Sequence, residues 1–206
     1  MIFCCHICII YQLYDLYKKY PNRNLKEGEC VTRVAPSPTG FFHLGGFYQA
    51  IIDYVIAKNT NGVFYVRNED TDQQREVEGA VDLIMNTLKH YDIMPDEYQY
   101  KDKIIGEYGP YTQSERKKIY HVFIKHLIEI GRAYPCFATK EELDELRETQ
   151  EKAKMRTGYY GRYAKCRKIP VSDAYEKIKN GEKYIIRLKS KGDFERKIKV
   201  KDAVKG

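Results

Sequence analysis

The segment VTRVAPSPTGFFHLGG, residues 31–46, combines residue types that suit an anion-binding site. Its two prolines cannot continue the strand that the preceding apolar residues predict, because proline has no backbone N–H. A helix that begins just after such a turn directs backbone N–H groups and the positive end of its dipole toward the turn, which favours a phosphate. His43 lies there and can donate to phosphate oxygens, while Gly45 and Gly46 lack the Cβ that would keep a nucleotide away from the backbone.

The same four residues, His43 to Gly46, also fit an ordinary turn with a partly buried histidine. Taken alone, these four residues favour the ordinary turn. Residues 30–35 predict a buried strand, and a helix runs from Gly45 to the Asn-Gly pair at 61–62. Residues 63–67 predict a second strand, which a second amphipathic helix follows. This alternation predicts an α/β fold with a parallel sheet and right-handed crossovers.

Beyond residue 116 the pattern becomes α+β. A helix stops at Gly131, and AYPCFA then predicts a strand. Thr139 and Glu142 predict a capping box at the start of a charged helix, and Ser172 is a candidate N-cap for a short one. The segments KYIIRLKS and RKIKVKD predict two strands of a basic sheet.

The composition permits a folded, soluble protein. The 206 residues are 43% hydrophobic and 32% charged, and 36 Lys and Arg against 29 Asp and Glu give a net charge of +7. The last stretch, 181–206, carries nine Lys or Arg and four Asp or Glu, so a polyanion partner and a merely solvated basic surface are both open. No membrane segment is predicted, because the apolar opening MIFCCHICII is only about ten residues long.

The six cysteines do not suggest a disulfide framework, since three fall within the first eight residues and the others are far apart. This spacing favours reduced thiols in a cytoplasmic protein. A metal site built from Cys5, His6 and Cys8 is an alternative for the opening segment.

The string RVAPSPTGFFHLGG, followed by RNEDTD at 67–72, resembles the amino-terminal part of the catalytic region of glutamyl-tRNA synthetases, a class I family. His43-Leu44-Gly45-Gly46 corresponds to the family's HIGH signature, and APSPTG and EDTD are the glutamate-type versions of their segments. Further similarity lies in REVEGAVDLI, YGPYTQSERKKIY, AYPCFATKEEL, GYYGRYAKCR and NGEKYIIRLKS. The resemblance covers roughly residues 15–206. It implies the first half of an incomplete Rossmann-like parallel sheet, followed by an α+β insertion that binds the acceptor end of tRNA.

The activity that the resemblance implies is that of a glutamate–tRNA ligase, which uses ATP with Mg²⁺ to form glutamyl-adenylate and then charges tRNA. The expected catalytic residues are His43, Gly45 and Gly46. The expected ATP-binding residues are Pro38, Thr39, Gly40, His43, Gly45 and Gly46. Glutamate is expected at Arg33, Ala35, Ser37 and Glu69, with Arg33 on its side-chain carboxylate and Glu69 on its ammonium. Without the resemblance, Arg33 would be interpreted as a surface strand residue, Ser37 as a turn former and Glu69 as part of a solvated acidic loop.

The resemblance also implies a division into an N-terminal extension (1–28), the first half of the nucleotide-binding domain (29–115) and an acceptor-binding lobe (116–206), in a monomer. Phosphate contacts to tRNA are expected from Arg187, Lys189 and Lys197. Tyr159, Tyr160 and Tyr163 are candidates either for stacking on an unpaired terminal base or for ordinary packing.

The sequence departs from the family pattern in three respects. Zinc is not expected, because Ala138 and Lys168 stand where two ligands occur in many members, which leaves Cys136 and Cys166. Asn68 and Val34 replace an apolar residue and a phenylalanine, and the amide of Asn68 is expected to perturb Glu69 slightly.

The third departure is that the 206 residues contain no KMSKS-type string, no later glutamate-pocket segment and no anticodon-binding domain. We therefore expect a fragment or truncated gene product with little or no activity alone. The alternatives are a non-catalytic module that binds the tRNA acceptor end, and a fragment of the glutamyl-Q-type paralogue that modifies an anticodon base.

Overall fold

The computed structural model describes residues 6–40, 42–72, 74–190 and 198–201. The chain divides into two compact units, one of Ile7–Val122 and one that contains His6 and the described residues from Phe123 onward. The main division therefore falls inside helix α4 (Lys117–Glu129). The three-part division derived from the sequence remains a prediction. Within the described ranges, none of the helices has the length and apolar character needed to cross a bilayer.

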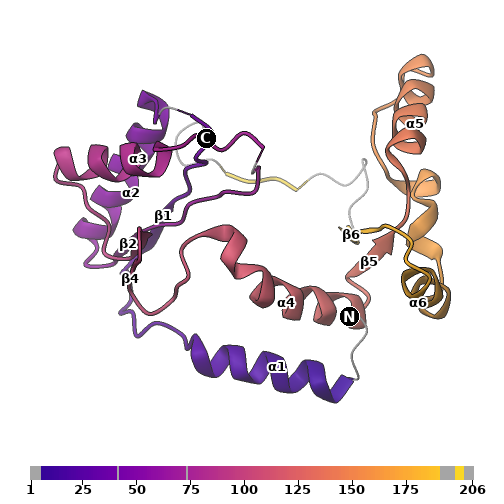
Figure 1. The fold of residues 1–206 in the computed structure, drawn as a ribbon, viewed down its shortest axis with the longest axis horizontal. Coiled ribbons are helices and arrows are strands. Elements are labelled where there is room, and N and C mark those ends of the chain that lie inside the picture. Colours follow the sequence, from indigo (N-terminus) through magenta and orange to yellow (C-terminus); the bar gives the residue numbers. More distant parts are fainter. Residues whose placement is uncertain (1–5, 41, 73, 191–197, 202–206) are drawn as a thin grey trace. The chain divides into compact units, whose positions relative to one another are not determined.

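The first unit contains the expected order of strand, helix, strand and helix (Figure 1). Its elements are α1 (His6–Lys19), β1 (Val31–Val34), α2 (Leu44–Asn59), β2 (Val63–Val66), α3 (Ala80–His90), β3 (Tyr98–Tyr100), β4 (Lys103–Ile105) and the 3₁₀ helix η1 (Gln113–Arg116). The strands β1 and β2 pair in parallel, from Val31 opposite Val63 to Val34 opposite Val66. The α/β class and the parallel pairing are thus confirmed. The strands β3 and β4 form an antiparallel hairpin.

One apolar core joins β1 and β2 to the helices α2 and α3. Ala50 and Ala57, seven residues apart on α2, are fully buried, so small side chains let this helix approach the strands closely. Phe64 of β2 is fully buried and packs edge-on against Tyr54, with ring centres 6.0 Å apart. The other buried members of this core are Val34, Val66, Ile84, Met85, Leu88 and Ile93.

The turn between α2 and β2 needs a residue without a side chain. The amide of Gly62 donates to Ala57 O at 2.8 Å, and that of Val63 donates to Cys30 O at 2.9 Å. A Cβ on Gly62 would lie 1.8 Å from the carbonyl oxygen of Cys30. The close contact between this turn and the residue before β1 therefore excludes every other amino acid.

The outer face of α2 is apolar and exposed. Its members recur at helical spacing: Leu44, Tyr48, Ile52, Val55 and Ile56. Among the described residues β1 pairs with β2 alone, and Val31 on β1 is 39% exposed. In this described part of the chain, β1 therefore has a free edge and α2 has an exposed apolar face.

The second unit contains the strands β5 (Ala133–Cys136) and β6 (Ile185–Leu188), which pair antiparallel. Its helices are α5 (Lys140–Lys152), α6 (Val171–Lys179) and the 3₁₀ helices η2 (Gly161–Tyr163) and η3 (Lys165–Lys168). The capping box is confirmed, since Thr139 Oγ1 accepts from Glu142 N at 3.2 Å and Glu142 Oε2 accepts from Thr139 N at 2.9 Å.

Two predictions for the second unit were wrong in part. Ser172 is not the N-cap of α6, because the helix follows Pro170, whose fixed φ suits a helix start. The hydroxyl of Ser172 instead donates to Asp173 Oδ1 at 2.9 Å. The partner of β6 is β5 rather than RKIKVKD; of that segment, residues 198–201 carry no strand and the rest lies outside the described residues.

Replacing Leu88 by alanine should destabilise the first unit strongly, because this side chain is fully buried between α3 and the strands. We expect a loss of about 2–5 kcal/mol in the free energy of unfolding, measured by urea denaturation. Leu83→Ala is the matched control, since Leu83 lies on the same helix and is 40% exposed. Equal losses for the two variants would contradict this packing.

Candidate functional site

The loop after β1 encloses a cavity of about 500 Å³ together with the start of α2. Seven of the residues that the sequence singled out line it: Ala35, Ser37, Thr39, Gly40, His43, Gly45 and Gly46. Pro38 does not line this cavity; it is fully buried beside a neighbouring one that also contacts Asn68 and Asp70. The motif residues therefore converge, and one proline of the motif serves as packing under the loop.

His43 is exposed at the mouth of this cavity and is the N-cap of α2. Its Nδ1 accepts a hydrogen bond from Gly45 N at 3.1 Å. In the neutral imidazole the proton then lies on Nε2, because a nitrogen that accepts cannot carry it. The capping bond thus selects the tautomer in which Nε2 can donate to a phosphate oxygen.

The amides of the first turn of α2 are used differently from the sequence expectation. The sequence predicted that these N–H groups point toward the turn, where a phosphate could accept from them. In the structure Gly45 N–H bonds the ring of His43, and the amides of Gly46 and Phe47 donate to His43 O at 3.0 and 3.2 Å. The histidine thus satisfies the donors itself, as N-caps do.

The two glycines lie where a side chain would intrude. A Cβ on Gly45 would come within 3.1 Å of the ring of His43, and one on Gly46 within 3.0 Å of the ring of Phe42. A side chain at either position would therefore press on a neighbouring ring that lines the cavity, which glycine avoids.

Arg33 and Glu69 contact each other. Arg33 Nη1 lies 2.5 Å from Glu69 Oε1, and Arg67 Nη2 lies 3.1 Å from the same oxygen. Both side chains of the shorter pair are about one-third exposed. The two residues predicted to hold opposite charges of one substrate thus neutralise each other in this structure.

Backbone bonds tie this ion pair to the cavity. Glu69 N donates to Pro36 O at 2.9 Å, and Arg67 N donates to Val34 O at 3.2 Å. These bonds continue the pairing of β1 and β2 beyond the strands and set the end of β2 beside the motif loop.

Sequence reasoning missed the supporting charged residues Arg67, Asp53 and Asp70. Arg67 is the first residue of the RNEDTD string, so its position alone could have suggested a role. Asp53 on α2 has Oδ2 buried without a hydrogen-bond partner among the described residues. Burial raises the pKa of Asp53 above its ordinary value, and the nearby Arg33 offsets only part of this effect. Asp70 Oδ1 accepts from Ser114 N at 2.8 Å.

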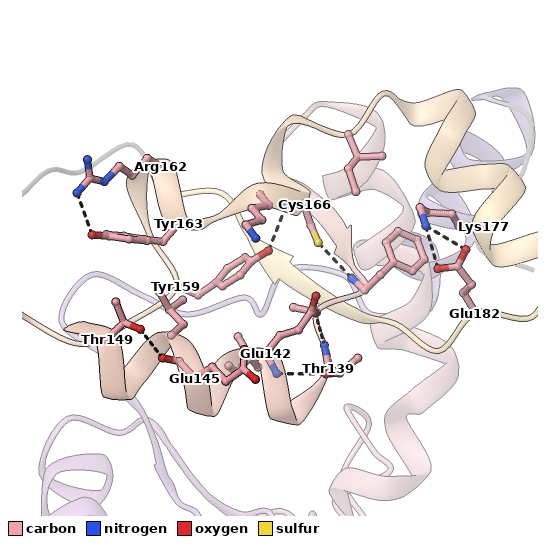
Figure 2. Close-up of a pocket in the computed structure, with 16 residues that line it drawn as sticks. Thr139, Glu142, Glu145, Thr149, Tyr159, Arg162, Tyr163, Cys166, Lys177 and Glu182 are labelled. Atoms are coloured by element: carbon pink, nitrogen blue, oxygen red, sulfur yellow. Dashed lines mark hydrogen bonds and ion pairs between the residues drawn. The ribbon is translucent and has the colours of Figure 1, made fainter. Parts of the chain in front are cut away.

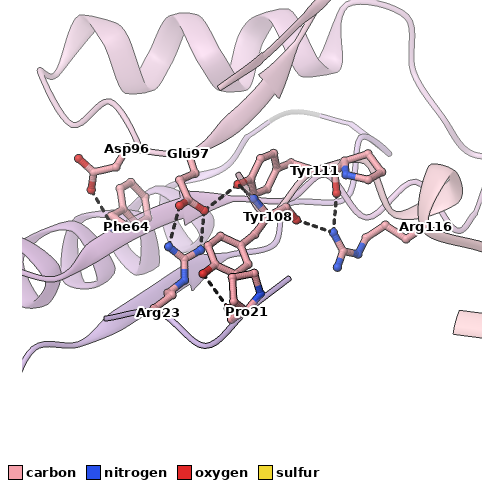
Figure 3. A network of polar contacts seen from close by, with 9 residues as sticks. Pro21, Arg23, Phe64, Asp96, Glu97, Tyr108, Tyr111 and Arg116 are labelled. Carbon is pink, nitrogen blue, oxygen red and sulfur yellow. Dashed lines mark hydrogen bonds and ion pairs between the residues drawn. The ribbon is translucent and has the colours of Figure 1, made fainter. Parts of the chain in front are cut away.

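A buried polar network around Glu97 (Figure 3) also contacts the end of β2, because Val66 N donates to Glu97 O at 3.0 Å. Arg23 forms two parallel bonds to Glu97, at 2.7 and 2.6 Å, and Tyr111 donates to Glu97 Oε2 at 2.7 Å. Burial alone would raise the pKa of Glu97, but the hydrogen bonds from Arg23 and Tyr111 outweigh it and hold this pKa below the usual 4.5.

A cavity of about 640 Å³ in the second unit lies beside α5 (Figure 2). Its charged lining residues are mixed in sign: Glu142, Glu145, Arg162, Lys165, Lys177 and Glu182. Lys177 and Glu182 pair with each other at 3.0 Å. This balance gives the cavity no strong preference for an anion.

The two thiols that the sequence related to zinc ligands are buried in this unit. Cys136 is 1% and Cys166 is 8% exposed, and Phe137 N donates to Cys166 Sγ at 3.4 Å. In the described part of the chain no group of three or more His, Cys, Asp or Glu residues could hold a metal ion. The donor set found here does not fit a four-ligand zinc site.

The structure describes two of the three basic residues expected to contact tRNA, Arg187 and Lys189. The guanidinium of Arg187 lies 4.5 Å from the ring centre of Tyr159, whose hydroxyl accepts from Cys166 N at 3.1 Å. Tyr159 is thus engaged in packing. Lys189 is half-buried, and its amide donates to Arg132 O at 2.7 Å. Lys197 lies outside the described residues.

Comparison with known proteins identifies the class to which this fold and loop belong. The family described as "tRNA synthetases class I (E and Q), catalytic domain" matches residues 29–206. The chain therefore belongs to the class I tRNA synthetases of this catalytic-domain family.

The curated relatives that it resembles are glutamate–tRNA ligases. The chain is 51% identical to the ligase of Clostridium beijerinckii over 190 residues. This match covers 92% of this chain and 34% of the relative. It is 46% identical over 187 residues to that of Acetivibrio thermocellus, with 91% and 34% covered. The chain spans about a third of the length of these relatives.

A solved structure of a glutamate tRNA ligase from Elizabethkingia meningosepticum, in complex with its amino acid, superposes with a TM-score of 0.68 and 36% identity. The match covers 78% of this chain and 32% of that one. The glutamyl-tRNA synthetase resemblance seen in the sequence is confirmed.

The depressed pKa of Glu97 predicts a pH-dependent stability. A carboxyl group with a lowered folded-state pKa adds stability above its unfolded pKa, and this contribution disappears as the pH falls through the folded value. Glu97→Gln should be less stable than wild type at pH 7, and the gap should narrow as the pH falls below 4.5. Urea midpoints between pH 7 and pH 2.5 measure it, and a gap independent of pH would contradict the assignment.

Proposed function

We propose that this chain supplies the glutamate- and ATP-holding part of a glutamate–tRNA ligase. The observation that carries the proposal is the convergence of the motif residues on one cavity, at whose edge the Arg33–Glu69 pair is tied through Pro36. The finer architecture that we infer is the first half of a Rossmann-like sheet, followed by a lobe for the acceptor end of tRNA.

Glutamate binds, in this proposal, by exchange of ion pairs. Its side-chain carboxylate replaces Glu69 on Arg33, and its ammonium moves onto the carboxylate of Glu69 that is thereby released. The planar fork of arginine suits a carboxylate. No protein charge is left unpaired, since Arg67 stays at hydrogen-bond distance from Glu69. Ala35 and Ser37 line the adjoining cavity and contact the amino acid there.

ATP is proposed to lie in the cavity with its phosphates at His43 and its adenosine above Gly45 and Gly46. The carboxylate of glutamate attacks the α-phosphorus and pyrophosphate leaves with the electron pair of the broken P–O bond, so no covalent protein nucleophile is required. Nε2 of His43 donates to a phosphate oxygen as negative charge shifts toward the leaving group. The residues thus act by positioning and charge stabilisation, with Mg²⁺ accompanying ATP.

For the 206 residues by themselves we propose substrate binding with little turnover. The sequence holds no KMSKS-type lysine string, and a lysine that neutralises phosphate charge contributes directly to transfer. A second candidate function is a module that binds the acceptor end of tRNA. The separate compactness of the second unit favours it, with basic residues such as Lys189 as phosphate contacts.

Replacing Arg33 by glutamine should weaken glutamate binding to the purified chain. A hydrogen bond to a charged group contributes about 1.5–3 kcal/mol, so the dissociation constant should rise by about ten- to a hundredfold. Isothermal titration calorimetry measures it. Arg75→Gln is the control, because Arg75 pairs with Asp72 at the surface and is 75% exposed. Unchanged affinity in Arg33→Gln, or no binding by wild type, would contradict the proposal.

Gel-shift and pyrophosphate-exchange assays on the same preparation separate the two candidate functions. If the chain holds glutamate and ATP but turns over slowly, exchange should remain far below that of a full-length relative while glutamate still binds. A tRNA shift without glutamate binding would favour the acceptor-binding module instead. Exchange at the rate of a full-length relative would refute the proposed dependence on further segments.

A further inference from the structure

We propose that Arg23, which lies outside every motif, is a positioning residue for the glutamate site: it holds the end of β2 through Glu97 and Tyr111. The inference rests on the proposed function for its ligand, but its structural part can be tested without one. Arg23 does not touch Arg33 or Glu69 in the described hydrogen bonds, so it acts only through the residues between them.

Arg23 is held on two sides. Its guanidinium forms the two bonds to Glu97, and its central carbon lies 3.9 Å from the ring centre of Tyr108. The side chains of Arg23 and Glu97 are only 19% and 11% exposed. A paired, hydrogen-bonded charge of this kind is strongly bound, because either partner alone would be a poorly solvated ion.

The segment that carries Arg23 is attached to the loop before η1. Tyr108 donates its hydroxyl hydrogen to Pro21 O, and Tyr20 donates to Gly109 O, both at 2.8 Å. Arg116 Nη1 donates to the carbonyls of Tyr108 and Pro110, at 3.0 and 2.7 Å. The N-terminal segment therefore lies against this loop and is hydrogen-bonded to it (Figure 3).

Glu97 passes this constraint to Tyr111. The phenol of Tyr111 is 2% exposed; it donates to Glu97 Oε2 and accepts from Tyr108 N at 3.1 Å. Burial and the bond to Glu97 raise the pKa of Tyr111, so the phenol stays protonated and remains a donor. Glu97 thus links Arg23 on one side to Tyr111 on the other.

Tyr111 and the residues after it hold both neighbours of Glu69. Asn68 N donates to Tyr111 O, and Gln113 N donates to Asn68 O, both at 2.9 Å. Ser114 N binds the carboxylate of Asp70. Glu69 N itself bonds Pro36 O. The strand end is therefore clamped between two loops, and Arg23 fixes one of them.

The test is backbone hydrogen exchange in the full chain, with glutamate titration beside it. In Arg23→Gln the amides of Asn68 and Gln113 should exchange about tenfold faster or more, while those of Ile84 and Leu88 on α3 keep their wild-type rates. Glutamate affinity should fall several-fold. Arg23→Lys keeps the charge but loses the fork, and should give intermediate rates at the same two amides.

Tyr111→Phe is the second variant, because it cuts the same chain of contacts one step later and keeps the ring in the core. Lys58→Gln is the matched control: Lys58 pairs with Asp96, next to Glu97, at 2.6 Å on the surface, and should leave the two amides unchanged. Unchanged exchange in both Arg23→Gln and Tyr111→Phe would overturn the proposal, as would uniform acceleration over α3. If wild type binds no glutamate, the proposed function fails while the exchange rates still decide the role of Arg23.

Discussion

The pairing of β1 with β2 continues past the end of both strands, and the candidate site depends on this extension. In the segment that follows Val34, the carbonyl oxygens of Pro36 and Pro38 accept hydrogen bonds from Glu69 N and Val77 N, at 2.9 and 2.8 Å. Proline supplies an acceptor and no donor, so the contact is one-sided. The loop can therefore follow β2 without becoming a strand before α2 begins at Leu44.

The charges around Glu69 form a balanced set before any ligand binds. Arg33 and Arg67 share one carboxylate oxygen, and the half-buried Asp53 lies in the field of Arg33. Such a set is stable because no partly buried ion lacks a counter-charge. A carboxylate that took the place of Glu69 on Arg33 would leave Glu69 with Arg67 alone. In the binding mode proposed above, the ammonium group of the amino acid then gives Glu69 a second positive partner.

Local signals in the sequence predicted the local features well. Thr139 and Glu142 lie three residues apart and form the capping box, and the alternating strands and helices gave the parallel pair. Ser172 misled because Pro170 starts the same helix more effectively. The Arg33–Glu69 pair was missed because each residue was considered only with a substrate. Arg23 and Glu97 are 74 residues apart, and no periodicity or spacing connects positions that only the tertiary fold brings together.

The contact of Gly62 with the carbonyl of Cys30 has a consequence for how this sequence can vary. A saturating mutational scan would find Gly62 as intolerant as any ligand-contacting position, although it belongs to a turn remote from the motif loop. Substitution there would push the start of β1 away from β2, since a methyl group cannot occupy 1.8 Å from an oxygen. Invariance at this glycine would then report backbone crowding rather than chemistry, and should be discounted when functional residues are sought from sequence variation alone.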